Sequence, residues 1–132
     1  MDDEGVPVLV VDDQAPFRMA ARAVVACACG FTLAGEASSG EDAVARAAEI
    51  RPALVLMDIK MPGISGIEAT RRLLRVVPDA VVFLCSTYAL ADLPGEARTS
   101  GACAYVHKEE LTAAMLAELW SVHAPGKCPD RH

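Results

Sequence analysis

Short apolar runs alternate with amphipathic segments along this chain, and that alternation constrains its fold more than any other feature. Five apolar runs have the length of buried strands, at residues 6–11, 31–37, 53–57, 80–85 and 102–106. Each is followed by a segment with helical spacing, at residues 15–29, 38–50, 65–77, 89–100 and 109–122. Alternating strands and helices favour a parallel sheet with helices on both faces. The sequence therefore predicts an α/β fold, a doubly wound five-stranded parallel sheet with five helices.

Local signals support some of these helices and disturb one. Ser65 stands three residues before Glu68, which fits a capping box at the start of the third helix. Pro94 and Gly95 fall inside the fourth expected helix, where proline costs about 3 kcal/mol and glycine about 1 kcal/mol. A shorter fourth helix capped by Asp92 is the alternative that the sequence leaves open.

Length and charge limit the range of functions. The 132 residues suit one domain, which we expect at 6–122, followed by a flexible tail or the start of a linker at 123–132. The net charge of −6 disfavours direct nucleic-acid binding, because phosphates would be repelled. No apolar run is long enough for a bilayer, and the acidic first residues do not resemble a secretory signal. We therefore expect a cytoplasmic protein with no membrane contact.

Polar side chains follow four of the five expected strands. Because the carboxyl ends of parallel strands meet at one edge of the sheet, these side chains should converge. Three of them are carboxylates, whose mutual repulsion would be relieved by a hard divalent cation such as Mg²⁺. The candidate residues are Asp12, Asp13, Asp58, Ser86, Thr87 and Lys108.

This set of groups suits phosphoryl transfer. A carboxylate near a metal ion can attack a phosphoryl group and form an acyl phosphate. The metal, a lysine and a hydroxyl can then hold the phosphoryl oxygens and offset their charge.

The same motifs resemble the receiver domain of two-component response regulators over about residues 6–122. They are LVVDD at 9–13, VLMDIKMPGISG at 55–66, VVFLCST at 81–87 and AYVHK at 104–108. The intervals also match, with 46 residues from Asp12 to Asp58, 28 more to Ser86 and 22 more to Lys108. The resemblance implies a flavodoxin-like sheet of order 2-1-3-4-5.

The resemblance also implies a role for each matching residue. Asp58 would be the phosphoacceptor and Lys108 the lysine that binds the phosphoryl group. Mg²⁺ would be bound by Asp13, by Asp58 and by the backbone carbonyl of Lys60, with Asp12 holding metal-bound water.

A switch and its partners are implied as well. Ser86 would move to the phosphoryl oxygen and Tyr105 would turn inward with it, changing the face formed by the fourth helix, fifth strand and fifth helix. The phosphoryl group would come from a histidine kinase or a small phosphodonor, and the changed face could support a homodimer. The chain is most similar to the subfamily with a helix-turn-helix output, so transcription is the expected output. An output domain beyond residue 132 and a stand-alone receiver both stay open.

The chain departs from the family pattern in two places besides the fourth helix. Glu109 follows Lys108 where the family often has proline, and Thr87 follows Ser86 as a competing hydroxyl. The spacing to Lys108 favours Ser86. Lys60 and Tyr88 occupy the two positions beside the approach of hydrolytic water, where they predict a long-lived phosphorylated state.

Three other functions compete with the receiver. A dinucleotide-binding domain needs a glycine-rich turn after the first strand, which is missing here. An aspartate-nucleophile phosphatase needs a D-x-D pattern after that strand, and Asp12-Asp13-Gln14 does not fit it. A receiver-like protein-interaction module that is never phosphorylated stays open.

Overall fold

The computed structural model describes residues 5–87 and 95–124 of the chain. Within them a five-stranded sheet has the order β2-β1-β3-β4-β5, and every neighbouring pair is parallel. This confirms the doubly wound, flavodoxin-like architecture. The strands are β1 (Val6–Val11), β2 (Phe31–Ala37), β3 (Leu54–Asp58), β4 (Val81–Ser86) and β5 (Ala104–His107).

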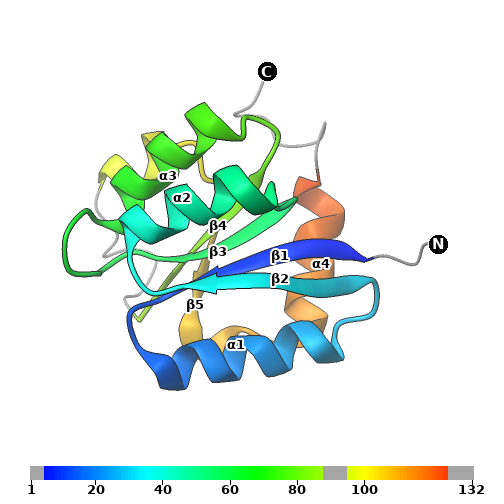
Figure 1. The fold of residues 1–132 in the computed structure, drawn as a ribbon. Coiled ribbons are helices and arrows are strands. Elements are labelled where there is room, and N and C mark those ends of the chain that lie inside the picture. The colour runs from blue at the N-terminus through cyan, green and yellow to red at the C-terminus, as the bar shows by residue number, and fades with distance from the viewer. Residues whose placement is uncertain (1–4, 88–94, 125–132) are drawn as a thin grey trace.

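Helices cover both faces of the sheet, α2 and α3 on one face and α1 and α4 on the other (Figure 1). They are α1 (Ala15–Cys27), α2 (Gly40–Ile50), α3 (Gly66–Val76) and α4 (Ala113–His123). Ser39, Ser65 and Thr112 precede α2, α3 and α4 and accept hydrogen bonds from backbone N–H groups of the first turn. The predicted Ser65 cap is confirmed.

The number of helices differs from the prediction. The described residues contain four α-helices, and Gly95–Thr99 forms a 3₁₀ helix (η2) inside the segment expected to be the fourth α-helix. Residues 88–94, which include the Asp92 of the alternative cap, lie outside the described part. The sequence Pro94-Gly95 explains why no α-helix forms at Gly95–Thr99. Proline lacks the backbone N–H that an α-helix needs, and glycine loses more conformational entropy than other residues when it becomes helical.

The last helix also starts later than expected. Lys108–Glu110 forms a 3₁₀ turn (η3), in which the Nδ1 atom of His107 accepts from the N–H of Glu109 at 3.2 Å. The α-helix begins only at Ala113, after the Thr112 cap. The expected start at Glu109 was wrong because helical spacing alone does not distinguish an α-helix from a preceding 3₁₀ turn.

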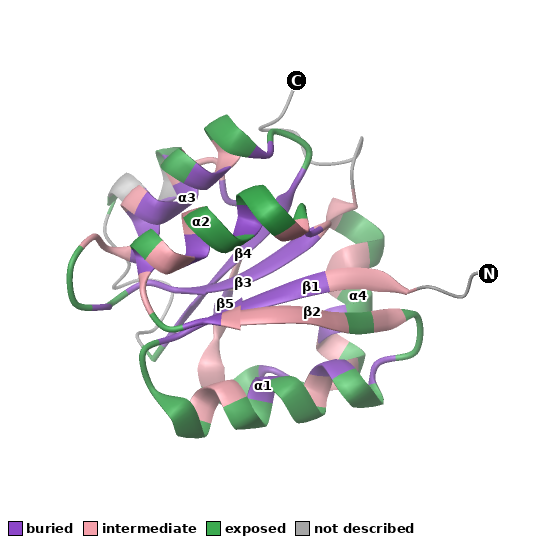
Figure 2. Cartoon of the chain, viewed as in Figure 1, coloured by how far each residue is buried: buried purple, intermediate pink, exposed green. Residues whose placement is uncertain are grey.

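Two apolar layers form the core, one on each face of the sheet. Alternate residues of β1 point to opposite layers, with Leu9 in one and Val8 in the other. Figure 2 shows the three central strands buried almost throughout.

Candidate functional site

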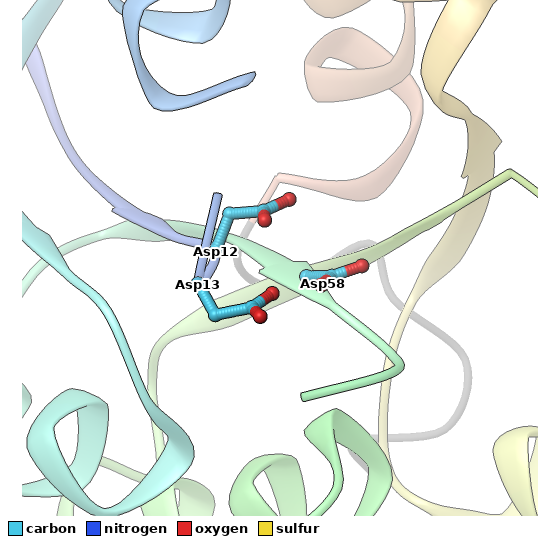
Figure 3. A group of neighbouring side chains, drawn as sticks. All are labelled: Asp12, Asp13 and Asp58. Atoms are coloured by element: carbon cyan, nitrogen blue, oxygen red, sulfur yellow. The ribbon is translucent and has the colours of Figure 1, made fainter. Parts of the chain in front are cut away.

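Three carboxylates gather where β1 and β3 end (Figure 3). The pairing of Val11 with Met57 aligns the two strands, so Asp12 and Asp13 leave the sheet beside Asp58. One oxygen from each of the three side chains lies within 4.8 Å of the other two. Asp12 and Asp58 are buried, whereas Asp13 is exposed to solvent. The sequence prediction that these residues converge is confirmed.

Asp12 is fully buried and is held by three residues. Its Oδ1 accepts from the N–H of Gln14 at 2.8 Å, and its Oδ2 accepts from Nζ of Lys108 at 2.5 Å. Its backbone carbonyl accepts from Nη1 of Arg18 in α1 at 2.6 Å. A buried charge is tolerated when it is paired and hydrogen-bonded in this way.

Lys108 joins the carboxylates from the end of β5. Its Nζ lies 3.1 Å from Oδ1 of Asp58 as well as 2.5 Å from Asp12. Burial alone would lower the pKa of Lys108, but the hydrogen bond and charges of the two aspartates outweigh burial and raise it. Lys108 therefore stays cationic in the site.

Asp58 is harder to ionise than an ordinary aspartate. Burial, together with the adjacent charge of Asp12, raises its pKa from 3.8 to about 6, against the opposing effect of Lys108. Among the described residues, the three carboxylates outnumber the ammonium groups of Lys108 and of Lys60 at the cavity, so the site has an excess of negative charge. A hard divalent cation fits this donor set, which offers carboxylate oxygens and an opening to water.

That opening is a cavity of about 430 Å³ at the same edge of the sheet. It is lined by Asp13, Gln14, Asp58, Lys60, Met61, Pro62, Thr87 and Lys108. The space admits a phosphoryl group beside Asp58. Lys60 is exposed and lies at the rim of this cavity, and its role as a ligand stays a prediction.

The hydroxyl and aromatic positions lie on β4 and β5. Ser86 is buried at the end of β4, and the following Thr87 is exposed and lines the cavity. The preference for Ser86 stays a prediction. Tyr105 is half-buried, and its hydroxyl donates to the carbonyl of Ala97 in η2 at 2.9 Å. Tyr88 lies outside the described residues.

Two side chains that contact the site were not predicted from the sequence. Phe17 places its ring 4.5 Å from Nζ of Lys108, and Arg18 binds the carbonyl of Asp12. The available signal was their position in the first turns of α1, directly after the paired aspartates. Gly66 was also missed, although it begins α3 with its Cα against the backbone of Asp58.

None of the helices in the described residues is both long and apolar enough to cross a bilayer.

Comparison with known proteins gives a consistent result. Residues 8–119 match the family model described as response regulator receiver domain. The response regulator GacA of Pseudomonas viridiflava is 39% identical over 119 residues, which cover 90% of this chain and 56% of that protein. The chemotaxis protein CheY of Thermotoga maritima is 36% identical over 104 residues, covering 79% of this chain and 86% of that protein.

A solved structure agrees with these relatives. The two-component response regulator of the LuxR family from Aurantimonas sp. SI85-9A1 superposes with a TM-score of 0.78 at 26% identity. The match covers 97% of this chain and 93% of that chain. This chain spans about half the length of the GacA proteins that it matches.

Proposed function

The chain belongs to the response regulator receiver domains, and we propose that it accepts a phosphoryl group on Asp58 from a histidine kinase or a small phosphodonor. A receiver is not a conventional enzyme. The proposed domain spans residues 6–122. The predicted tail at 123–132 lies mostly outside the described residues, and the cytoplasmic location stays a prediction.

The observation that carries this proposal is the position of Asp58 between opposite charges. Nζ of Lys108 lies 3.1 Å from Oδ1 of Asp58. One carboxylate oxygen each of Asp12 and Asp13 lies within 4.8 Å of a carboxylate oxygen of Asp58. The ionised carboxylate attacks phosphorus, so that a new O–P bond forms while the bond to the leaving group breaks. Lys108 then offsets charge on the phosphoryl oxygens, and a hydroxyl from Ser86 donates to another of them.

Mg²⁺ is the cation that we propose for the acidic triad. Asp13, Asp58 and the carbonyl of Lys60 would bind it, with Asp12 acting through a water molecule. The bound ion supplies positive charge beside the transferring phosphoryl group. The support is the excess of carboxylates over ammonium groups at this edge of the sheet.

The proposed output is a change of surface away from the site. Ser86 and Tyr105 would move together and alter the face made by the segment before β5, by β5 and by α4, where a homodimer would form. The bond from Tyr105 to Ala97 supports this, because it joins β5 to η2. A helix-turn-helix output that controls transcription is proposed from the match to LuxR-family regulators.

Intact mass after incubation with Mg²⁺ and a small acyl phosphate tests the proposal. We expect the wild type to gain one phosphoryl group and Asp58→Asn to gain none. Asp79→Asn is the matched control, since Asp79 is exposed just before β4, at the other edge of the sheet. An adduct of full yield in Asp58→Asn would falsify the assignment. A wild type that is never modified, by acyl phosphate or by a kinase, would favour the interaction module instead.

A further inference from the structure

The ring of Phe17 contacts the ammonium group of Lys108. This contact is not part of the charged site, and the sequence did not predict it. Nζ of Lys108 lies 4.5 Å from the ring centroid, a distance typical of a cation–π contact. Phe17 is the third residue of α1 and is half-buried. It begins the inward stripe that continues through Ala21 and Val25, so the end of this stripe reaches the carboxyl edge of the sheet.

The ring completes the surroundings of the ammonium group. Lysine has three N–H donors, and two acceptors, Asp12 and Asp58, are already in place. An aromatic face attracts a cation without a directional hydrogen bond. Its attraction therefore persists when the ammonium group turns from one acceptor to another.

Phosphorylation requires such a turn. In the present geometry Lys108 contacts a carboxylate oxygen of Asp58, and in the phosphorylated site its partner would be a phosphoryl oxygen further from the sheet. We propose that Phe17 is a positioning residue, whose ring keeps the Lys108 ammonium group at the site during phosphoryl transfer. This inference rests on the proposed function.

A structural role must be separated from this one. Phe17 also packs against the apolar layer beneath α1, so its removal could slow the reaction simply by loosening the helix. Phe31 offers a matched control, because it is also half-buried and packs against the same layer. It starts β2 at the opposite edge of the sheet, where its ring meets Trp120 at 6.1 Å.

The test is a double-mutant cycle on the initial rate of phosphorylation by a small acyl phosphate. The four proteins are the wild type, Phe17→Leu, Lys108→Met and the double variant. We expect Phe17→Leu to slow the wild-type reaction by roughly threefold to tenfold. In the Lys108→Met background the same change should alter the rate by less than about twofold, because its effect passes through Lys108.

Two further variants and a spectroscopic measurement complete the design. Phe17→Tyr keeps the aromatic face and should retain the rate, and Phe31→Leu should leave the rate unchanged. Urea unfolding of each variant restricts the comparison to conditions in which all are folded. In NMR spectra, the Lys108 side-chain protons should show a ring-current shift that Phe17→Leu abolishes and Phe31→Leu preserves.

Three outcomes would overturn the role proposed for Phe17, and the measurements tell them apart. Equal slowing by Phe17→Leu in both backgrounds would show a structural role and overturn the inference. A rate for Phe17→Leu equal to that of the wild type would overturn it as well, while leaving the proposed function intact. A wild type that forms no adduct would overturn the proposed function first, and this inference with it.

Discussion

Asp58 is a buried carboxyl group beside a second buried carboxyl group, and its ionisation therefore costs folding free energy. Its pKa of about 6 lies well above the 3.8 of an ordinary aspartate, and after allowance for solvent screening this corresponds to roughly 2 kcal/mol. Without metal at pH 7.5, we expect Asp58→Asn to be more stable than the wild type by roughly 2 kcal/mol in urea unfolding. Asp79→Asn, an exposed change of the same kind, should stay within about 0.5 kcal/mol of the wild type.

The difference in unfolding free energy between Asp58→Asn and the wild type should grow as the pH rises. Well below pH 3.8 the Asp58 carboxyl is neutral in both folded and unfolded chains, and near pH 4 wild type and Asp58→Asn should still differ little. As the pH rises towards 6, the unfolded chain releases the proton first and the wild type loses stability relative to the variant. Above pH 6 the difference should be constant. A gap that is the same at pH 4 and pH 7.5 would contradict the raised pKa.

Lys60 gives a second prediction for a single residue, concerning the lifetime of the phosphorylated state. It lies exposed at the rim of the cavity, and its ammonium group cannot accept a hydrogen bond from attacking water. We expect Lys60→Asn to speed loss of the phosphoryl group severalfold, because the amide oxygen can orient that water. Lys60→Met, which removes the charge without adding an acceptor, is the control. Equal decay of wild type and Lys60→Asn, followed by intact mass, would refute water orientation at this position.

The sequence predicted the charged part of the site better than its apolar surroundings. Asp12, Asp13, Asp58 and Lys108 follow strands whose ends must meet, so topology alone brings them together. The contact of Phe17 with Lys108 depends on side-chain rotamers across two elements, which spacing does not specify.

At the scale of elements, the start of α3 is tied to the end of β3. A Cβ atom on Gly66 would overlap the backbone carbonyl oxygen of Asp58, and the N–H of Gly66 donates to the carbonyl of Ile59 at 2.7 Å. Gly66→Ala must therefore push α3 away from the phosphoacceptor strand. We expect a loss of roughly 2 kcal/mol or more in unfolding free energy, and a lower phosphorylation rate.

Gly95→Ala is the control for this prediction. Gly95 is exposed at the start of η2, and a Cβ atom there would meet nothing within 4 Å. The variant should stay within about 0.5 kcal/mol of the wild type. If Gly66→Ala were equally mild, close contact between α3 and Asp58 would not constrain the site.

The elements themselves differ in how far sequence could predict them. β1, β3 and β4 are continuous apolar runs that end at charged or hydroxyl residues, and their positions were predicted to within about a residue. The segment 89–100 has helical spacing but contains Pro94-Gly95, and its described part is the 3₁₀ helix at Gly95–Thr99. Local propensity is weak wherever two helical forms compete.

For the whole molecule, metal binding should be coupled to folding, because the triad is assembled only when β1 and β3 pair. A ligand that binds the folded chain alone stabilises it by mass action, by about 1.4 kcal/mol at ten times its dissociation constant. We expect Mg²⁺ to raise the unfolding free energy by this amount. Sodium chloride at the same ionic strength is the control, because screening of the net charge of −6 also stabilises the chain.

Protons and metal compete for Asp58, so the stabilisation by Mg²⁺ should depend on pH. At pH 5, one unit below the pKa of about 6, only about a tenth of Asp58 is ionised, and metal affinity should fall about tenfold relative to pH 7.5. The added stability should therefore shrink as the pH falls. Asp13→Asn should remove most of it at both pH values, whereas Asp79→Asn, with the same change in net charge, should retain it. Urea unfolding with and without Mg²⁺ measures each case. Equal stabilisation of Asp13→Asn and Asp79→Asn would mean that Mg²⁺ acts on the overall charge and not at the triad.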